Sequence, residues 1–251
     1  MSELSYKRTA LIGVLCGIVN GLFGAGGGMI AVPMMEMYGV ETKKAHATSL
    51  FLMLSVSIVS SYVYITNEQA NYSELLCLVP AGLAGAAFGC IIMKKINADS
   101  LKKLFSCLMI FFGLRIIIKG YEVTMMLLFV LIGFFSGMTA SMGLGGGSIL
   151  ILFLTMVLNY EQKTAQGVNL LFFIPIALFS TIVYIKNGII EWKKIIPTII
   201  TGMISSFISA NILVKMSSSL LRKAFGAFIL IIGIKTLFSL TKSRKISSPL
   251  S

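Results

Sequence analysis

Charged residues are scarce in this sequence, and only 12% of its 251 residues are Asp, Glu, Lys or Arg. Soluble domains usually carry about 25% charged residues, whereas 57% of this chain is apolar and its mean hydropathy is +0.93. Long apolar stretches recur from end to end, so we expect an integral membrane protein without a soluble domain. The N-terminal stretch has a basic flank but no small-residue cleavage site, and we interpret it as a first membrane segment rather than a cleaved signal peptide.

Acidic residues are the rarest charged class, and the nine of them lie in predicted loops or at the ends of apolar segments. No carboxylate is therefore expected in the middle of a membrane segment, where it could relay protons or sodium ions. The sequence also contains no nucleotide-binding domain, so we expect neither ATP hydrolysis nor an enzyme. The nine acids are Glu3, Glu36, Glu41, Glu68, Glu74, Asp99, Glu122, Glu161 and Glu191.

Cysteine is also sparse, with Cys16, Cys77, Cys90 and Cys107 all inside apolar segments. Their spacing is typical of neither a metal site nor a redox motif, so no cofactor and no metal are predicted. We interpret all four as small buried residues. The alternative is a sulfur-handling or redox cysteine, for which Cys16 lies nearest to a glycine run.

The basic residues give the chain a net charge of +12, and they stand in short clusters between the apolar segments. This pattern is typical of membrane topology signals. The expected partner of the chain is therefore the lipid bilayer, and no nucleic acid is predicted.

The chain contains one unit twice. The stretch "GAGGGMI" (24–30) recurs as "GLGGGSI" (143–149), and "ETKKAHATSLF" (41–51) recurs as "EQKTAQGVNLL" (161–171). From the second pair onward the offset stays at 120 residues. Chance similarity between apolar segments would not hold one register for so long, so we infer a duplication.

We expect five helical segments in each repeat, the first repeat covering residues 1–120 and the second 121–251. A full membrane crossing needs about 20 helical residues, and the second segment of each repeat is too short for one. The sequence therefore predicts an all-α polytopic membrane protein with broken or re-entrant half-helices that begin at the glycine runs. The predicted segments are 8–23, 29–39, 45–65, 74–93 and 101–118, then 124–142, 148–158, 165–185, 195–214 and 220–239.

The basic residues also predict how the repeats are oriented. If each glycine run turns the chain back, each repeat crosses an odd number of times and the second repeat is inverted. With both termini in the cytoplasm, this arrangement places 15 of the 21 Lys and Arg residues on the cytoplasmic side. Parallel repeats would divide them 10 to 11, so the positive-inside rule favours inverted repeats in the cell membrane. The basic residues within 215–223 would then face outward, against the rule.

The glycine runs interrupt the chain inside apolar regions, where glycine costs a helix about 1 kcal/mol relative to alanine. In inverted-repeat transporters, broken helices near the membrane midplane form the substrate site, and a helix N-terminus offers free N–H groups to an anion. We therefore predict two substrate-binding loops; the alternative is close helix packing, which we expect for the separate run "GLAGAAFG" (82–89). The candidate loop residues are Gly24, Gly26, Gly27, Gly28, Gly143, Gly145, Gly146 and Gly147.

Polar residues near these loops are further candidates for the substrate site, because polar groups inside a membrane are costly unless they face a cavity or a partner. His46, the only histidine, has Gln166 as its equivalent in the second repeat, and Ser49 has Asn169. The alternatives are a helix-start role for these pairs and interhelical hydrogen bonds for the remaining three. The polar candidates are Asn20, His46, Ser49, Thr139, Ser141, Gln166 and Asn169.

The repeated glycine motif resembles that of a known family. A G-x-G-G-G run that is approached through small residues and followed by an apolar stretch ending in proline, present twice, is similar to the motif of the sulfite exporter TauE/SafE family. The resemblance covers nearly the whole chain and implies a secondary transporter of small sulfur-containing anions such as sulfite, sulfoacetate or related organosulfonates. Two departures stand out. Pro33 corresponds to Leu152, and "SGMTASMGLGGG" (136–147) is interpreted as holding extra residues before its glycines.

Two other functions stay open on the residues alone. An anion channel could use the same loops as a filter, and an intramembrane enzyme could pair His46 with a serine. The duplication argues against the enzyme, because Gln166 replaces the histidine in the second repeat and no G-x-S-x-G-type context is present. The substrate, the coupling ion and the oligomeric state are not predicted.

Overall fold

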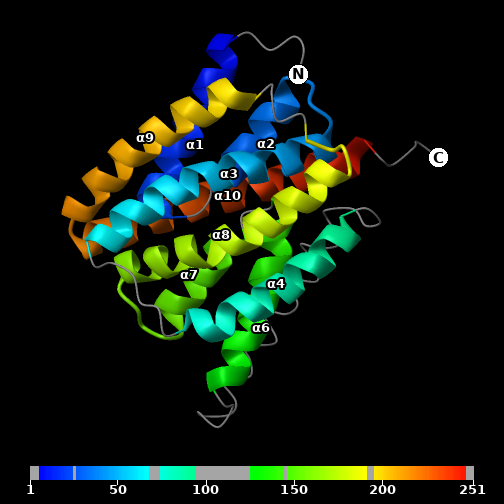
Figure 1. The fold of residues 1–251 in the computed structure, drawn as a ribbon. Helices are drawn as coiled ribbons and strands as arrows, with labels where there is room; N and C mark the ends of the chain where they lie inside the picture. Colours follow the sequence, from blue (N-terminus) through cyan, green and yellow to red (C-terminus); the bar gives the residue numbers. More distant parts are fainter. Residues whose placement is uncertain are drawn as a thin grey trace.

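The computed structural model describes residues 6–24, 27–67, 74–93, 125–143, 146–190 and 195–246. All regular structure in these ranges is helical (Figure 1). The predicted segment 101–118, with Cys107, and the loop glycines Gly26 and Gly145 lie outside the described residues. The helices are α1 (Tyr6–Phe23), α2 (Gly27–Met37), α3 (Thr42–Thr66), α4 (Leu75–Ile92), α6 (Met125–Ser141), α7 (Gly147–Met156), α8 (Gln162–Lys186), α9 (Ile196–Lys215) and α10 (Ser218–Ile246).

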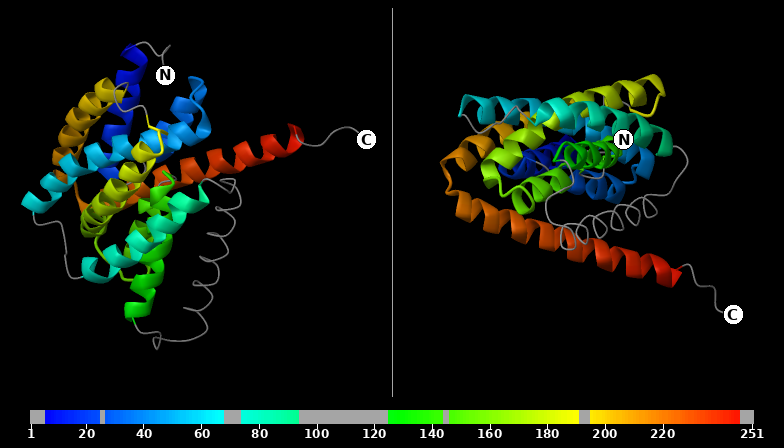
Figure 2. Two further views of the ribbon diagram at one scale, coloured as in Figure 1. Left: turned by 45° about the vertical axis from the view of Figure 1, so that its right-hand side comes forward. Right: turned by 90° about the horizontal axis from the view of Figure 1, so that it is seen from below.

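The structure confirms the predicted all-helical fold. Among the described helices, α3, α4, α8 and α9 are long and apolar enough to cross a membrane. The helices α2 and α7 span only 11 and 10 residues, as expected for half-helices. The prediction for the last segment is wrong at its end, because α10 continues beyond residue 239 to Ile246. Figure 2 shows α10 running along the edge of the helix bundle and past it toward the C-terminus.

Each glycine run reverses the direction of the chain. Gly24 has a φ of 62° and Gly143 a φ of 69°, a backbone conformation that glycine adopts without steric cost. In the first repeat, the Arg8 guanidinium near the start of α1 lies 5.3 Å from the centre of the Tyr38 ring, just past the end of α2. In the second repeat, the rings of Phe129 near the start of α6 and Phe153 near the end of α7 lie 6.4 Å apart. Each first helix therefore forms a hairpin with the half-helix that follows it.

The two turns differ by one residue. The Gly24 N–H donates to the carbonyl of Asn20, four residues back, at 2.8 Å, whereas the Gly143 N–H donates to the carbonyl of Ala140, three residues back, at 2.9 Å. The second turn is thus the shorter one. The expectation of extra residues before the second glycine run is wrong.

The main contacts between helices of the two repeats each have an equivalent contact in which the roles of the repeats are interchanged. The helix pair α1 and α9 corresponds to α6 and α4, and the pair α3 and α9 corresponds to α8 and α4; all four pairs are in contact (Figures 1 and 2). The first helix of each repeat therefore packs on the fourth helix of the other repeat. The central pair is α3 and α8, which are themselves equivalent.

Small residues allow the first and fourth helices to approach closely. A Cβ on Gly17 would overlap the Gly202 carbonyl in the α1–α9 pair, and a Cβ on Gly137 would overlap the Gly82 carbonyl in the α6–α4 pair. Gly85 and Gly89 also face the backbone of α6. The predicted packing role of residues 82–89 is confirmed.

The central helices α3 and α8 run antiparallel. The Tyr64 hydroxyl near the end of α3 donates to Gln166 Oε1 near the start of α8 at 2.9 Å. Figure 1 shows the same arrangement, with α3 and α8 side by side and their colours progressing in opposite directions.

Candidate functional site

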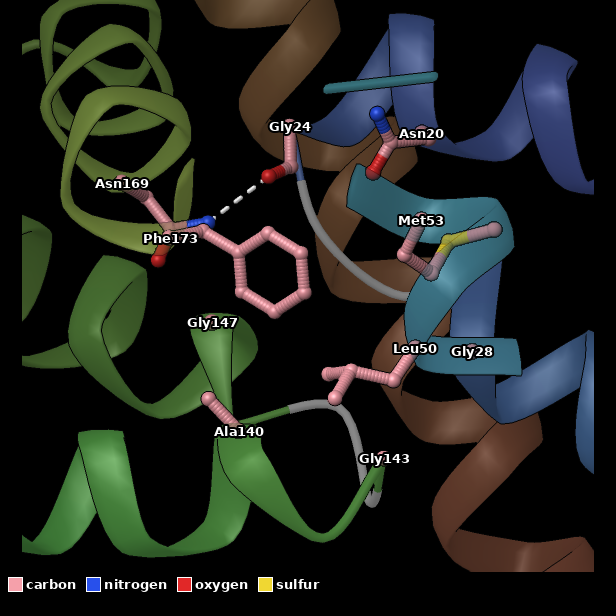
Figure 3. Close-up of a pocket in the computed structure, with 10 residues that line it drawn as sticks. All are labelled: Asn20, Gly24, Gly28, Leu50, Met53, Ala140, Gly143, Gly147, Asn169 and Phe173. Carbon is pink, nitrogen blue, oxygen red and sulfur yellow. Dashed lines mark hydrogen bonds between the residues drawn. The ribbon is translucent and has the colours of Figure 1, made fainter. Parts of the chain in front are cut away.

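A pocket lies between the two glycine turns (Figure 3), and its empty volume, including the part open to solvent, is about 350 Å³. Most of its lining consists of equivalent residues from the two repeats, so the pocket lies between them. None of the ten lining residues is charged. The equivalent pairs are Asn20 with Ala140, Gly24 with Gly143, Gly28 with Gly147, and Met53 with Phe173; Leu50 and Asn169 complete the lining.

The two half-helices begin at this pocket. Gly28 and Gly147, in the first turns of α2 and α7, both line it. The next residues of the two helices meet, since the Ser148 hydroxyl lies 3.9 Å from the Met29 sulfur. The first N–H groups of a helix have no partner within the helix, and each N-terminus carries about half a positive charge. Two such N-termini face one neutral pocket.

Each glycine turn rests on the long helix of the other repeat. Asn169 Nδ2 on α8 donates to the Gly24 carbonyl at 2.7 Å, and Figure 3 shows this bond at the edge of the pocket. A Cβ on Gly24 would lie 2.9 Å from the Cβ of Gln166. In the same way, a Cβ on Gly143 would lie 2.7 Å from the His46 carbonyl of α3. Both repeats are therefore needed to build either side of the pocket.

The first glycine turn lies near the start of α8 and not at its middle, because Gly24 contacts Gln166. Gln166 is the fifth residue of α8, which has 25 residues. At about 1.5 Å per residue, this position lies roughly 12 Å from the middle of the helix. The half-helix N-termini lie closer to the middle, because a Cβ on Gly28 would lie 3.9 Å from Met53 Cγ, near the centre of α3.

The structure brings some of the predicted site residues to the pocket. Its lining includes six of them: Asn20, Gly24, Gly28, Gly143, Gly147 and Asn169. His46, Ser49 and Gln166 lie directly behind the turns, and the Ser49 hydroxyl donates to the His46 carbonyl at 2.8 Å. Gln166 Nε2 and Asn169 Oδ1 are buried without a hydrogen-bond partner.

Four other candidates do not line the pocket. A Cβ on Gly27 would meet the Met53 sulfur and the Cys16 carbonyl, and a Cβ on Gly146 would overlap the backbone of Ser136 and Ala140 in α6. These two glycines pack against the first helix or the long helix of their own repeat.

The hydroxyls of Thr139 and Ser141 bond within their own helix. Thr139 Oγ1 donates to the Phe135 carbonyl at 3.0 Å, and Ser141 Oγ donates to the Met138 carbonyl at 2.8 Å. Neither acceptor lines the pocket, so these bonds do not hold the two hydroxyls at the pocket.

Sequence reasoning did not single out the apolar lining residues Leu50, Met53 and Phe173. Figure 3 shows the Phe173 ring between Gly24 and Gly147. An apolar residue in an apolar helix carries no local signal, although the pairing of Met53 with Phe173 by the repeat offset could have drawn attention to both.

Sequence reasoning also did not single out two buried tyrosines, Tyr64 and Tyr184. The Tyr64 hydroxyl lies 3.4 Å from the Gly21 carbonyl at the end of α1, and the equivalent Tyr184 hydroxyl donates to the Ser141 carbonyl at the end of α6 at 2.9 Å. Both tyrosines belong to the repeated motif "VYIxN" (63–67 and 183–187), which was an available signal. Each one ties the last turn before a glycine run to a long helix.

Comparisons with known proteins find similar membrane transporters. The family model of the sulfite exporter TauE/SafE matches residues 9–236. The probable membrane transporter protein YdhB of Bacillus subtilis is 25% identical over 91% of this chain and 98% of its own length, and the probable membrane transporter protein YunE of the same organism is 30% identical over 46% of this chain and 44% of its own length. The sulfite exporter TauE/SafE family protein 1 of Arabidopsis thaliana is 30% identical over 35% of this chain and 20% of its own length. No solved structure matches the chain.

Proposed function

Because the chain belongs to the sulfite exporter TauE/SafE family of membrane transporters, we propose that it is a secondary transporter that exports small sulfur-containing anions such as sulfite, sulfoacetate or related organosulfonates. The observation that carries this proposal is the meeting of two half-helix N-termini, marked by Gly28 and Gly147, at one uncharged pocket. The substrate would bind there without a metal or a cofactor.

The lining suits a small anion. Backbone N–H groups at helix N-termini and the amides of Asn20 and Asn169 can donate hydrogen bonds to anionic oxygens. Met53, Leu50 and Phe173 exclude water on the remaining sides, which strengthens each hydrogen bond to a bound charge. In a site without fixed charges, the anion can be released because no salt bridge has to be broken.

We further propose that residues 1–120 and 121–251 form inverted repeats, with both termini in the cytoplasm, and that the repeats move against each other to give alternating access. The antiparallel packing of α3 and α8 supports the inversion. Two of the basic residues that this orientation places outside have a structural role: Lys163 Nζ donates to the Val214 carbonyl at 2.8 Å, and Arg222 Nη2 donates to the Thr155 carbonyl at 3.2 Å. Both cations satisfy helix C-termini, so they are weak topology signals.

Reconstituted protein tests the proposal. Purified protein in liposomes should take up radiolabelled sulfite with saturation, and sulfoacetate should compete while acetate at the same concentration competes less. Flux that does not saturate would identify a channel instead, and the absence of any flux of sulfur-containing anions would contradict the proposed substrate class.

A matched pair of variants connects the flux to the pocket. In Gly28→Ala the added methyl group would lie 3.3 Å from the Gly143 carbonyl, inside the pocket, whereas in Gly226→Ala it would meet nothing within 4 Å. Gly28→Ala should reduce saturable uptake and Gly226→Ala should not. Equal uptake by both variants would show that the substrate binds elsewhere.

A further inference from the structure

One flank of the pocket is built from an asparagine and three serines. Asn20, which lines the pocket, donates through Nδ2 to Ser57 Oγ at 3.3 Å and to Ser60 Oγ at 3.4 Å. The Ser60 hydroxyl is hydrogen-bonded in turn to the Ser206 hydroxyl of α9. All four side chains are at least 97% buried. We call Asn20, Ser57, Ser60 and Ser206 the hydroxyl cluster; it lies between α1, α3 and α9.

The equivalent positions of the other flank are almost all apolar. Asn20 corresponds to Ala140, Ser57 to Ala177 and Ser206 to Ala86, and each of these alanines is fully buried. The fourth position is Ser180, which donates to the Ile176 carbonyl of its own helix at 2.8 Å. Since the same helix packing is built there with alanine, the fold itself does not require the hydroxyl cluster.

The difference continues along the two equivalent fourth helices. Thr201, Ser205 and Ser209 of α9 are replaced in α4 by small apolar residues, which are Ala81, Gly85 and Gly89. Thr201 and Ser209 contribute hydrogen bonds to the carbonyls of Ala10 and Gly17 in α1, at 3.2 and 3.3 Å. The fourth helix thus contributes hydroxyls to the α1–α9 contact but none to the α4–α6 contact, where Gly89 faces the Ser141 hydroxyl of α6.

We propose that the hydroxyl cluster lines a one-sided passage by which a small oxyanion enters or leaves the pocket, while the equivalent flank of Ala86, Ala140 and Ala177 stays dry. This inference rests on the proposed transport function and adds to it the side of the pocket that opens. Asparagine and serine inside a membrane protein either bond across helices or face a polar cavity, because polar groups there are costly without a partner. Here they adjoin the pocket directly, since Asn20 belongs to both.

The geometry of the cluster suits a temporary contact with an anion. The bonds from Asn20, at 3.3 and 3.4 Å, are longer than the usual 2.9–3.0 Å of N–H···O bonds, so their exchange for bonds to an anionic oxygen costs little. Hydroxyl and amide hydrogens replace the water that a small oxyanion loses.

The passage is closed in this structure. Beyond Ser60, toward the ends of α3 and α9 that lie together in Figure 1, the buried side chains of Val63, Tyr64 and Leu213 pack into one apolar cluster. Opening would require this cluster to separate.

Thiol accessibility tests the asymmetry, with the two flanks as controls for each other. In a background in which Cys16, Cys77, Cys90 and Cys107 are replaced by alanine, single cysteines are introduced as Ser57→Cys and Ser206→Cys on the polar flank. The matched controls are Ala177→Cys and Ala86→Cys. A small anionic methanethiosulfonate reagent is added to protein in liposomes, and the modified fraction is measured by mass spectrometry.

The polar-flank cysteines should be modified, methanesulfonate should protect them, and their matched controls should stay unmodified. Equal modification of both flanks, or none on either flank, would overturn the passage. The labelling pattern is read without a transport assay. If the cysteine-free parent transports sulfite but the polar flank is not labelled, the passage is wrong and the transport function stands.

A second measurement separates the passage from a structural role. Ser206→Ala copies the equivalent Ala86 and should lower the maximal rate of sulfite uptake without lowering the unfolding temperature, whereas Ser180→Ala should change neither. A lower unfolding temperature of Ser206→Ala together with an unchanged rate would assign the hydroxyl to packing and overturn the passage.

Discussion

The bond between Asn169 and the Gly24 carbonyl gives a sharp test of an anion site at the pocket. Asn169→Asp keeps the shape of the side chain but removes the Nδ2 donor of the 2.7 Å bond and introduces a carboxylate. Since Asn169 lines the pocket and is 99% buried, this carboxylate would repel a bound anion. At about 6 Å and an effective dielectric constant of about 20 the repulsion is about 3 kcal/mol, or roughly a hundredfold loss of affinity.

The loss should depend on pH. Burial disfavours the charged form of the introduced carboxyl and raises its pKa. Below that pKa the neutral acid can again donate a hydrogen bond to the Gly24 carbonyl and no longer repels the substrate. Uptake by Asn169→Asp should therefore recover as the pH falls through the raised pKa, whereas the loss in Asn169→Ala should not vary with pH relative to the parent.

The assay is sulfite uptake into liposomes at a series of pH values, each normalised to the parent protein. Asn187→Asp is the matched control, because Asn187 is an exposed residue at the end of the same helix whose Nδ2 donates to the Val183 carbonyl at 2.6 Å. It should transport like the parent. Asn169→Asp with the parent's uptake even at the most alkaline pH of the series, or with a loss there no larger than that of Asn187→Asp, would refute an anion site beside Asn169.

Three further predictions concern packing, energy source and topology. Gly137→Ala should lower the unfolding temperature in detergent, because its Cβ would overlap the Gly82 carbonyl, while Gly226→Ala should not lower it; equal stability of the two would mean that the α4–α6 contact can relax. Sulfite flux should follow an imposed membrane potential, which supplies about 2.3 kcal/mol per charge per 100 mV, and His46→Gln should retain substantial activity; flux that instead follows a pH gradient and disappears in His46→Gln would show proton coupling. Single cysteines in residues 94–103 and 186–194 should both be labelled from the cytoplasmic side, and labelling from opposite sides would favour parallel repeats.

The helices could be predicted because each leaves a local pattern in the sequence. A long apolar run predicted α8, and a short run that begins at a glycine cluster predicted α7. The end of α10 could not be predicted in this way. The helix continues through "TKSRK" (241–245) to Ile246. The predicted segment ended where the apolar residues end, but polar residues can continue the backbone hydrogen bonds of a helix.

The pocket could be predicted only in part, because its glycines have a local signal and its neighbours do not. The repeated motif identified Gly28 and Gly147, whereas Met53 and Phe173 resemble any other apolar residue of their helices. Each turn contacts the long helix of the other repeat through residues more than ninety positions apart in the sequence, such as Asn169 and Gly24. The repeat offset predicts which residues are equivalent, but not which of them touch.

Each glycine turn contacts the long helix of the other repeat, and this contact limits how the proposed motion of the repeats can proceed. The segment from Gly24 to Gly28 is anchored at one end to α8 of the other repeat, through Asn169, and continues at the other end into α2, which packs on α1 and α3 of its own repeat. If the repeats move against each other, either the backbone of this segment changes its conformation or the bond between Asn169 and the Gly24 carbonyl breaks. Glycine has the widest range of backbone dihedral angles, so a glycine-rich segment can absorb such a displacement where a regular helix could not. The same glycines thus place the half-helix N-termini at the pocket and would allow the proposed movement of the repeats around it.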